Sequence, residues 1–162
     1  MCEIREAGQG DLDGLLDLYT HLHHNPIPNI DERIERIWTH IIGNKCQHII
    51  VATVDERIVS SCTIVIIPNL TQGQRPYALI ENVVTSKEYR QKGMATACLE
   101  FAKSIATKEG CYKIMLLTGV KGSEIERFYE NAGYDGNDKR AFVQWLPDEN
   151  GEFHRPSTSE PK

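Results

Sequence analysis

Apolar positions along the chain recur with two periods, one of three to four residues and one of two. The longer period predicts four helices, at Asp11 to before Asn25, after Asn29 to Gly43, 92–108 and Ser123 to before Gly133. Short β-branched or alternating runs predict six strands, at 2–6, 48–54, 58–67, 77–85, 112–117 and 141–146.

Several residues at the ends of these segments predict how the segments start and stop. Asp11 is placed to cap the first helix, and Gly43 to end the second in a left-handed conformation. Ser123 and Glu126 have the spacing of a capping box, and residues 55–57 join two strands as a hairpin.

The order of these elements, β-α-α-β-β-β-α-β-α-β, predicts a mixed α+β fold. Most strands are expected to pair antiparallel, with one strand-helix-strand crossover over 77–117 that makes a parallel pair. We expect one domain over 1–147, followed by a flexible tail over 148–162 that is rich in Pro, Ser and Glu.

Composition and charge narrow the class of partner. The 162 residues are 40% hydrophobic and 25% charged, as in a globular domain, and the net charge is −5. A negative chain does not attract nucleic acid or anionic lipid at long range, so any bound anion must be held locally. The chain start lacks an apolar leader, and the aliphatic run 64–67 is too short for a membrane span.

The five cysteines are an odd set without a C-x-x-C pair, which favours free thiols in a reducing cytoplasm. We assign none of them to catalysis. His21, His23 and His24 do not share one helix face, so no metal site is expected there.

The passage from strand 77–85 into the next helix is the strongest candidate for chemistry. Amides at a helix start lack internal partners, so this turn can hold phosphate oxygens. Arg90 and Lys92 supply countercharge, and Gly93 and Ala95 lack bulk that would keep an anion away from the backbone. An ordinary turn with solvated basic residues is the alternative.

Three segments carry a resemblance to a known family. Residues 90–95, Arg-Gln-Lys-Gly-Met-Ala, resemble the R/Q-x-x-G-x-G/A signature of the GCN5-related N-acetyltransferases (GNAT). Residues 80–85 resemble that family's fourth strand, and residues 128–134 its F-Y-x-x-x-G-F/Y segment. The resemblance covers about 2–146 and implies the GNAT fold, a mostly antiparallel mixed sheet of six to seven strands with about four helices.

The resemblance also implies a reaction and a binding site for its co-substrate. The acetyl group of acetyl-CoA would pass directly to an amine in a ternary complex, without metal. The backbone of Val83 and Val84 would pair with the pantetheine arm. The turn residues would hold the pyrophosphate: Arg90, Gln91, Lys92, Gly93, Met94, Ala95 and Thr96.

Two residues are candidates for proton transfer. Glu81 is a carboxylate in an apolar strand, which is costly unless its charge is used. We therefore expect Glu81 to be partly buried and to serve as the base, directly or through a water. Alternatively, Glu81 pairs with Arg75 or is exposed at the rim of the sheet. The resemblance implies that Tyr129 protonates the departing thiolate of coenzyme A. Alternatively, Tyr129 is only an aromatic residue of the core, and its hydroxyl makes an incidental hydrogen bond.

The acceptor site is expected under two connectors, 23–28 and 68–76, with His24, Arg75 and Tyr77 as substrate-binding residues. Similarity to glucosamine-phosphate acetyltransferases favours a small amine, such as an amino sugar. One alternative is that the acceptor is an amine of a protein or peptide. Another is that the protein is a non-catalytic acyl-CoA sensor. Homodimers are common in the family.

Overall fold

The computed structural model of the protein describes residues 2–22, 26–120 and 122–153. They form two compact units, the first ending at Leu116 and the second beginning at Leu117. The helices and strands of the first unit are β1 (Cys2–Glu6), α1 (Leu12–Tyr19), α2 (Glu32–Gly43), β2 (Gln47–Val54), β3 (Arg57–Ile67), β4 (Tyr77–Thr85), α3 (Met94–Lys108) and β5 (Ile114–Leu116). The second unit contains α4 (Ser123–Asn131).

The sheet of the first unit has the strand order β1-β2-β3-β4-β5. Neighbours from β1 to β4 pair antiparallel, and β4 pairs parallel with β5. The parallel pair confirms the crossover expected over 77–117, with α3 as its helix. β4 itself lies where the sequence predicts it, at Tyr77–Thr85.

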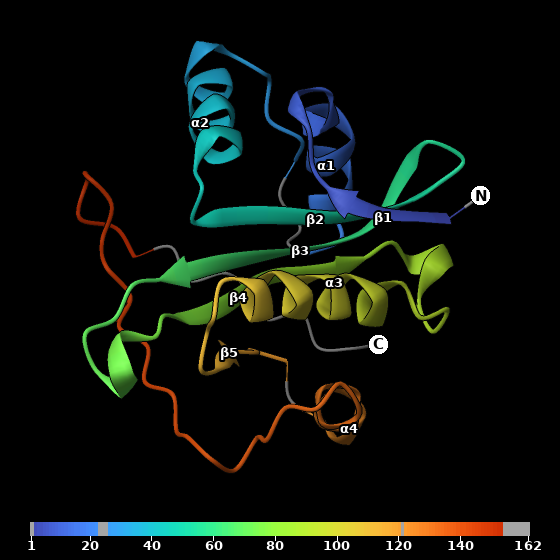
Figure 1. Ribbon diagram of the computed structural model, residues 1–162. Coiled ribbons are helices and arrows are strands. Elements are labelled where there is room, and N and C mark those ends of the chain that lie inside the picture. The colour runs from blue at the N-terminus through green and yellow to red at the C-terminus, as the bar shows by residue number, and fades with distance from the viewer. Residues whose placement is uncertain (1, 23–25, 121, 154–162) are drawn as a thin grey trace. The chain divides into compact units, whose positions relative to one another are not determined.

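The helices of the first unit cover both faces of this sheet, α1 and α2 on one and α3 on the other (Figure 1). Leu15, Leu18 and Trp38 form one core with buried residues of β2, β3 and β4. On the other face, Cys98 and Ala102 of α3 are fully buried. In the middle of β3, Ser61 and Thr63 lie near Tyr19 of α1, whereas Ser60 lies near Cys98 of α3. Neighbouring side chains of this part of β3 therefore point to opposite faces of the sheet.

Asp11 does not cap α1 as the sequence predicts. Its carboxylate accepts hydrogen bonds from Gly8 N at 2.6 Å and from both terminal nitrogens of Arg5 at 2.6 and 2.9 Å. The guanidinium of Arg5 lowers the pKa of this carboxyl. Asp11 ends a short 3-10 turn, Gln9–Asp11, so its side chain faces back toward β1 rather than into the helix.

The second helix ends at Gly43 as predicted, but Gly43 is not left-handed as the sequence predicts. Gly43 is the last helical residue of α2, and Asn44 follows it in an extended conformation with φ −85°. Asn44 accepts the amide of Cys46 through its side chain at 2.9 Å, which turns the chain into β2 without a left-handed glycine. At the other end, Asp31 caps α2 by accepting from Ile34 N at 2.9 Å.

The predicted strand 141–146 is absent, and the sheet has five strands instead of six or seven. Residues 141–146 have no regular structure, and Phe142 is 88% exposed. A strand needs a neighbour to pair with its N–H and C=O groups, and the described part of the second unit contains no other strand. The alternating pattern alone does not supply that neighbour.

The second unit confirms the apolar stripe of its helix but not the predicted cap. Ile125, Phe128, Tyr129 and Ala132 are each half-buried. Gly122 occupies the N-cap position, so Ser123 lies inside α4 and no side chain caps it. Gly133 ends the helix with φ +90°, as predicted.

Candidate functional site

The first feature of the site is a bulge in β4. Ser61 of β3 faces Val84 and Thr63 faces Glu81, so Asn82 and Val83 together lie opposite the single residue Cys62. Asn82 adopts φ +53°, a left-handed conformation that asparagine tolerates better than most residues. The bulge bends the strand in the middle of the segment 80–85.

The second feature is the open edge of β4 beyond this bulge. β5 pairs with β4 only from Ala78 to Ile80. From Glu81 to Thr85, no strand of the described chain pairs with the edge of β4 that faces away from β3. A ligand with amide groups can therefore pair with this edge as an additional strand would.

Backbone contacts decide which residues face that edge. Val84 O accepts the hydroxyl of Ser60 at 2.9 Å, and Ser86 N donates to Val59 O at 2.9 Å. Val84 therefore faces β3, and by alternation Val83 and Thr85 face the open edge. The geometry favours Val83 and Thr85 over the predicted pair of Val83 and Val84.

The third feature is the turn between β4 and α3. Gln91 has φ +58° and Gly93 has φ +80°, and α3 starts at Met94. The first hydrogen bond into the helix is from Ala97 N to Gly93 O at 2.9 Å. No acceptor within the described residues bonds the six amides from Gln91 to Thr96.

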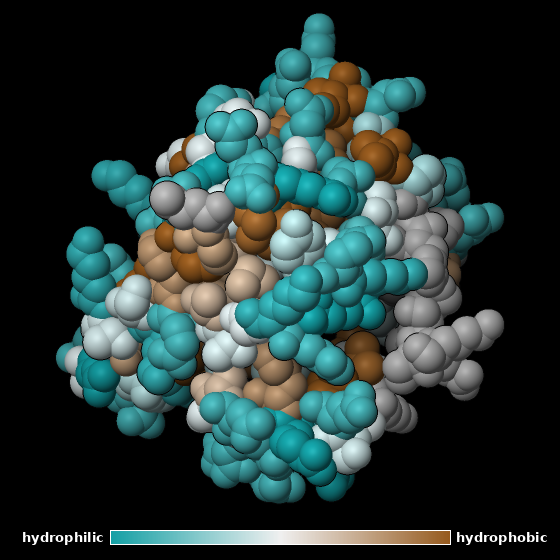
Figure 2. Space-filling view, turned by 90° about the vertical axis from the view of Figure 1, so that its right-hand side faces the viewer, coloured by the Kyte–Doolittle hydropathy of each residue, from teal (hydrophilic) through white to brown (hydrophobic). Residues whose placement is uncertain are grey.

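These six amides make the turn suited to an anion, because free N–H groups and the helix dipole both favour negative charge there. A Cβ built on Gly93 meets no atom within 4 Å, so its positive φ is what requires glycine in the unliganded chain. The prediction that bulk must be avoided there stays a prediction. Figure 2, seen from the side of this turn, shows hydrophilic residues next to a hydrophobic region.

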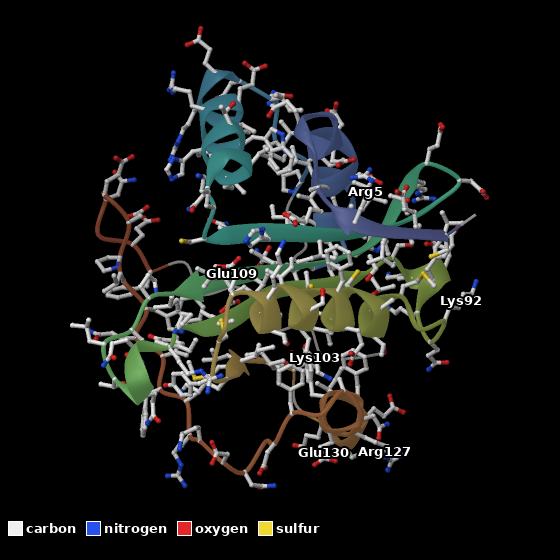
Figure 3. The ribbon with its side chains drawn as sticks, in the orientation of Figure 1. Arg5, Lys92, Lys103, Glu109, Arg127 and Glu130 are labelled. Carbon is white, nitrogen blue, oxygen red and sulfur yellow. The ribbon has the colours of Figure 1, made fainter. Side chains whose placement is uncertain are left out.

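The two cations of the turn lie beside the amides. Arg90 Nε donates to Thr85 O at 3.3 Å, which ties the start of the turn to the end of β4. Lys92 Nζ lies 5.1 Å from the centroid of the Tyr89 ring, and its side chain extends outward at the N-terminal end of α3 (Figure 3). Both side chains are exposed and add positive charge near the free amides.

Glu81 lies at the start of the bulge, on the face of the sheet that α1 covers. Its cross-strand partner is Thr63, and directly opposed residues share one face. Glu81 is exposed, so the expectation of partial burial is wrong. Its alternative partner, Arg75, is also excluded, because Arg75 donates instead to Gly110 O at 3.1 Å and Cys111 O at 3.0 Å.

Two of the three predicted substrate-binding residues, Arg75 and Tyr77, do not lie beside Glu81. Tyr77 is four residues away along β4, which is about 13 Å in a strand. Its ring packs against Tyr112 at 6.2 Å, with Lys113 Nζ 5.4 Å from its centroid. Arg75 is engaged with Gly110 and Cys111 at that same end, and His24 lies outside the described residues.

Tyr129 belongs to the second unit. Its ring contacts Phe128 at 4.9 Å and Tyr134 at 6.1 Å, both edge to face. It is half-buried in this aromatic group, as its place on the apolar stripe predicts.

The described residues were also searched for a metal-binding group, a membrane-spanning helix and exposed thiols. They contain no group of three or more His, Cys, Asp or Glu arranged to hold a metal, and no helix suited to crossing a membrane. The thiols of Cys62 and Cys98 are buried, and burial raises the pKa of Cys98 to about 11. The thiols of Cys2 and Cys46 are exposed.

Several residues of the site carry no signal in the sequence. Asn82, which forms the bulge, and Thr85, which accepts from Arg90, stand in an ordinary strand pattern. In the sequence, Tyr19 is only one of the apolar positions of the first predicted helix. Its phenol lies close to the hydroxyls of Ser61 and Thr63, a contact that only the packing of α1 on β3 creates.

Comparison with known proteins identifies the family. The model of the acetyltransferase (GNAT) family matches residues 12–134. A glucosamine 6-phosphate N-acetyltransferase from Trypanosoma brucei brucei is 29% identical over 146 residues, which are 85% of this chain and 92% of that protein.

Solved structures agree with this result. A putative acetyltransferase from Agrobacterium tumefaciens is 35% identical, with a TM-score of 0.81 over 88% of this chain and 99% of its own. A glucosamine-6-phosphate N-acetyltransferase from Arabidopsis thaliana has the same fold, with a TM-score of 0.77 over 89% and 98% of the two chains at 20% identity. The chain belongs to the GNAT acetyltransferase family and is an acetyl-CoA-dependent N-acetyltransferase.

Proposed function

We propose that the protein transfers the acetyl group of acetyl-CoA to the primary amine of a small molecule, with an amino sugar phosphate as the acceptor class. The main support for the co-substrate is the run of six free amides from Gln91 to Thr96, next to the open edge of β4. The Trypanosoma relative, named for action on glucosamine 6-phosphate, supports the acceptor class.

The residues of the first unit fit the two parts of a coenzyme A molecule. The free amides suit the pyrophosphate, because they need acceptors and lie at a positive helix end. Val83 and Thr85 present backbone groups to the open edge, where the pantetheine amides can pair. When bound, acetyl-CoA supplies the thioester from which the acetyl group leaves.

Glu81 is proposed as the base that removes a proton from the acceptor ammonium. Its exposure favours this role in one respect, since a carboxylate in contact with solvent can release the proton again after each turnover. It lies at the bulge, beside the segment proposed to hold the pantetheine arm. The role of Tyr129 as the acid that protonates the thiolate rests on the resemblance of 128–134 to the family segment.

An assay of acceptor-dependent thiol release tests this proposal. We expect release from acetyl-CoA with glucosamine 6-phosphate, and slower or no release with glucosamine or a lysine peptide. Faster release with the peptide would identify a protein acetyltransferase instead. Binding of acetyl-CoA in calorimetry without release for any amine would identify a sensor and reject the enzymatic proposal.

Substitution of the proposed base tests its role. In Glu81→Gln, kcat/KM should fall by roughly 10²- to 10⁴-fold, the usual contribution of acid-base catalysis, while the KM for acetyl-CoA changes little. Glu109→Gln is the matched control, because Glu109 is exposed at the opposite end of α3 from Lys92 (Figure 3). A normal kcat/KM in Glu81→Gln would rule out Glu81 as the base.

A further inference from the structure

The sheet of the first unit has one face that α1 and α2 cover only in part. The core beneath these helices takes its strand residues from Ile49 and Val51 of β2, Ile58 of β3 and Val84 near the end of β4. Among the described residues, this core includes none from 65–81 and none from β5. The two helices therefore leave the part of this face over 65–81 and β5 less covered.

A row of side chains along β4 lies on this part of the face. Glu81 shares its face with Thr63, which lies close to Tyr19 of α1. Leu79 and Tyr77 follow at intervals of two residues, so they share the face of Glu81. Their cross-strand partners on β3 are Val65 and Ile67. The row thus runs from the bulge toward the start of β4.

Met115 of β5 widens this row. It lies beside Leu79 in the parallel pair, and Lys113 comes two residues earlier on the same face. The pairing extends to Lys113, whose carbonyl oxygen accepts the amide of Ala78 at 3.0 Å. Together, Val65, Leu79 and Met115 form an apolar surface, which we call the floor.

The floor is more accessible than the opposite face of the same two strands. Its three side chains are half-buried. The neighbouring side chains that point toward α3 are at most 7% exposed, and they are Ile64, Ile66, Ala78 and Ile80. Solvent, and therefore a small molecule, reaches the floor and not the opposite face.

The two ends of the floor carry opposite charges. The exposed carboxylate of Glu81 lies at the end next to the bulge. At the other end, Lys113 Nζ lies 5.4 Å from the centroid of the Tyr77 ring and 5.4 Å from that of Tyr112. The backbone positions of Glu81 and Tyr77 are about 13 Å apart along the strand.

The ammonium of Lys113 is held in place without being neutralised. The faces of the two tyrosine rings attract it. Among the described residues, no carboxylate forms an ion pair with Lys113. Its N–H groups can therefore donate to the oxygens of a bound anion, and such charge-assisted hydrogen bonds are strong.

A small molecule with an amine at one end and an anionic group at the other matches these charges. We propose that the acceptor lies along the floor with its amine at Glu81 and its phosphate at Lys113, and that Lys113 selects phosphorylated amines. The inference rests on the proposed function and assigns the residue that recognises the acceptor's phosphate.

The same charges determine the direction in which the acceptor binds. The reversed orientation would place the phosphate against the carboxylate of Glu81 and the amine against the ammonium of Lys113, and both contacts are repulsive. Both side chains can extend along the floor, so a hexosamine phosphate can reach both. Binding in this direction presents the amine at the bulge, next to the open edge of β4.

Calorimetry with glucose 6-phosphate tests the phosphate contact without any need for turnover, because this sugar carries the phosphate and lacks the amine. In the presence of coenzyme A, we expect the wild-type protein to bind it. In Lys113→Gln the Kd should rise about tenfold, because one charge-assisted contact is lost. A wild-type protein that does not bind glucose 6-phosphate, or equal Kd values in the two proteins, would overturn the inference.

Two further variants show whether the charge of Lys113 is what matters. Lys113→Arg keeps the positive charge and should hold the Kd for glucose 6-phosphate within about threefold of the wild type. Lys108→Gln is the matched control, since Lys108 is an exposed lysine at the end of α3 and its loss should leave this Kd unchanged. An equal loss of binding in Lys108→Gln would show a general effect of charge and reject the assignment.

Steady-state kinetics separates recognition of the phosphate from a general loss of structure. In Lys113→Gln, the KM for glucosamine 6-phosphate should rise about tenfold, while kcat and the KM for acetyl-CoA stay within about twofold. The kcat/KM for glucosamine should not fall, because this acceptor has no phosphate to lose. An equal fall for both acceptors would reject Lys113 as the selecting residue.

Failure of this inference and failure of the proposed function give different results. If the wild-type protein releases no coenzyme A with any amine, the proposed function is wrong, and calorimetry still decides whether Lys113 binds a sugar phosphate. If it does release coenzyme A with glucosamine 6-phosphate, and Lys113→Gln has the same KM for that acceptor, the proposed function stands and the role of Lys113 is rejected.

Discussion

At the scale of single residues, the backbone angles of the turn before α3 determine how its amides are presented. Gln91 and Gly93 both adopt positive φ, and the residues around them leave six amides free. For glycine this conformation costs nothing, whereas for other residues it costs about 1 to 2 kcal/mol.

Gly93→Ala therefore tests whether the turn binds acetyl-CoA. A Cβ at this position meets nothing within 4 Å, so the substitution acts through backbone strain alone. We expect the Kd for acetyl-CoA in calorimetry to rise about tenfold, which is about 1.4 kcal/mol. Gly110→Ala is the matched control, since Gly110 has φ +74° and open space at the other end of α3. Equal Kd values in both variants would contradict the assignment.

The ion pair between Asp11 and Arg5 makes the stability of the protein depend on pH. The guanidinium of Arg5 lowers the pKa of the Asp11 carboxyl. The pair therefore stabilises the protein above the ordinary carboxyl pKa of about 4, and this contribution is lost as the pH falls through the lowered value.

Asp11→Asn should destabilise the protein by about 1 to 2 kcal/mol at pH 7, since Arg5 is partly exposed and solvent weakens the pair. Urea unfolding at pH 7 and pH 3 measures this difference, which should shrink at the lower pH. A difference that grows on acidification would show that the Asp11 carboxyl is not stabilised in its charged form.

At the scale of elements, the bulge in β4 separates the part of the strand that pairs with β5 from the part with an open edge. Asn82 makes this possible because it tolerates φ +53°. The sequence pattern of 80–85 contains no sign of the bulge, since asparagine also occurs at exposed positions of regular strands.

Two substitutions at Asn82 separate conformation from side-chain chemistry. Asn82→Val places a β-branched residue at positive φ and should cost about 1 to 2 kcal/mol in urea unfolding, with a lower kcat. Asn82→Gly keeps the conformation available and should stay near the wild type in kcat. If both variants lose turnover equally, the Asn82 side chain rather than the bulge is needed.

The elements also show which parts of the structure the sequence determines locally. The periodicity predicts β4 at its observed bounds and α3 and α4 to within a few residues, because each has a complete apolar face. It misjudges the roles of Asp11, Gly43 and Ser123, since capping depends on where the chain turns beforehand. The position of Tyr19 beside Ser61 and Thr63 follows from packing and lies beyond any local pattern.

At the scale of the whole molecule, the proposed domain limit at residue 147 can be tested by truncation. The resemblance to the family ends near residue 146, and the following residues are polar and rich in proline. A chain that ends at residue 147 should keep its Tm within about 2 °C and its Kd for acetyl-CoA. A large fall in Tm would show that residues after 147 belong to the folded domain.

The open edge of β4 has a consequence for the protein before it meets its co-substrate. Backbone groups that no strand occupies can also be taken by a strand from another molecule, which is a common route to aggregation. A ligand lying along β4 removes that opportunity and favours the folded state by mass action. If acetyl-CoA binds along β4 as proposed, we expect aggregation of the protein to decrease as the concentration of acetyl-CoA rises.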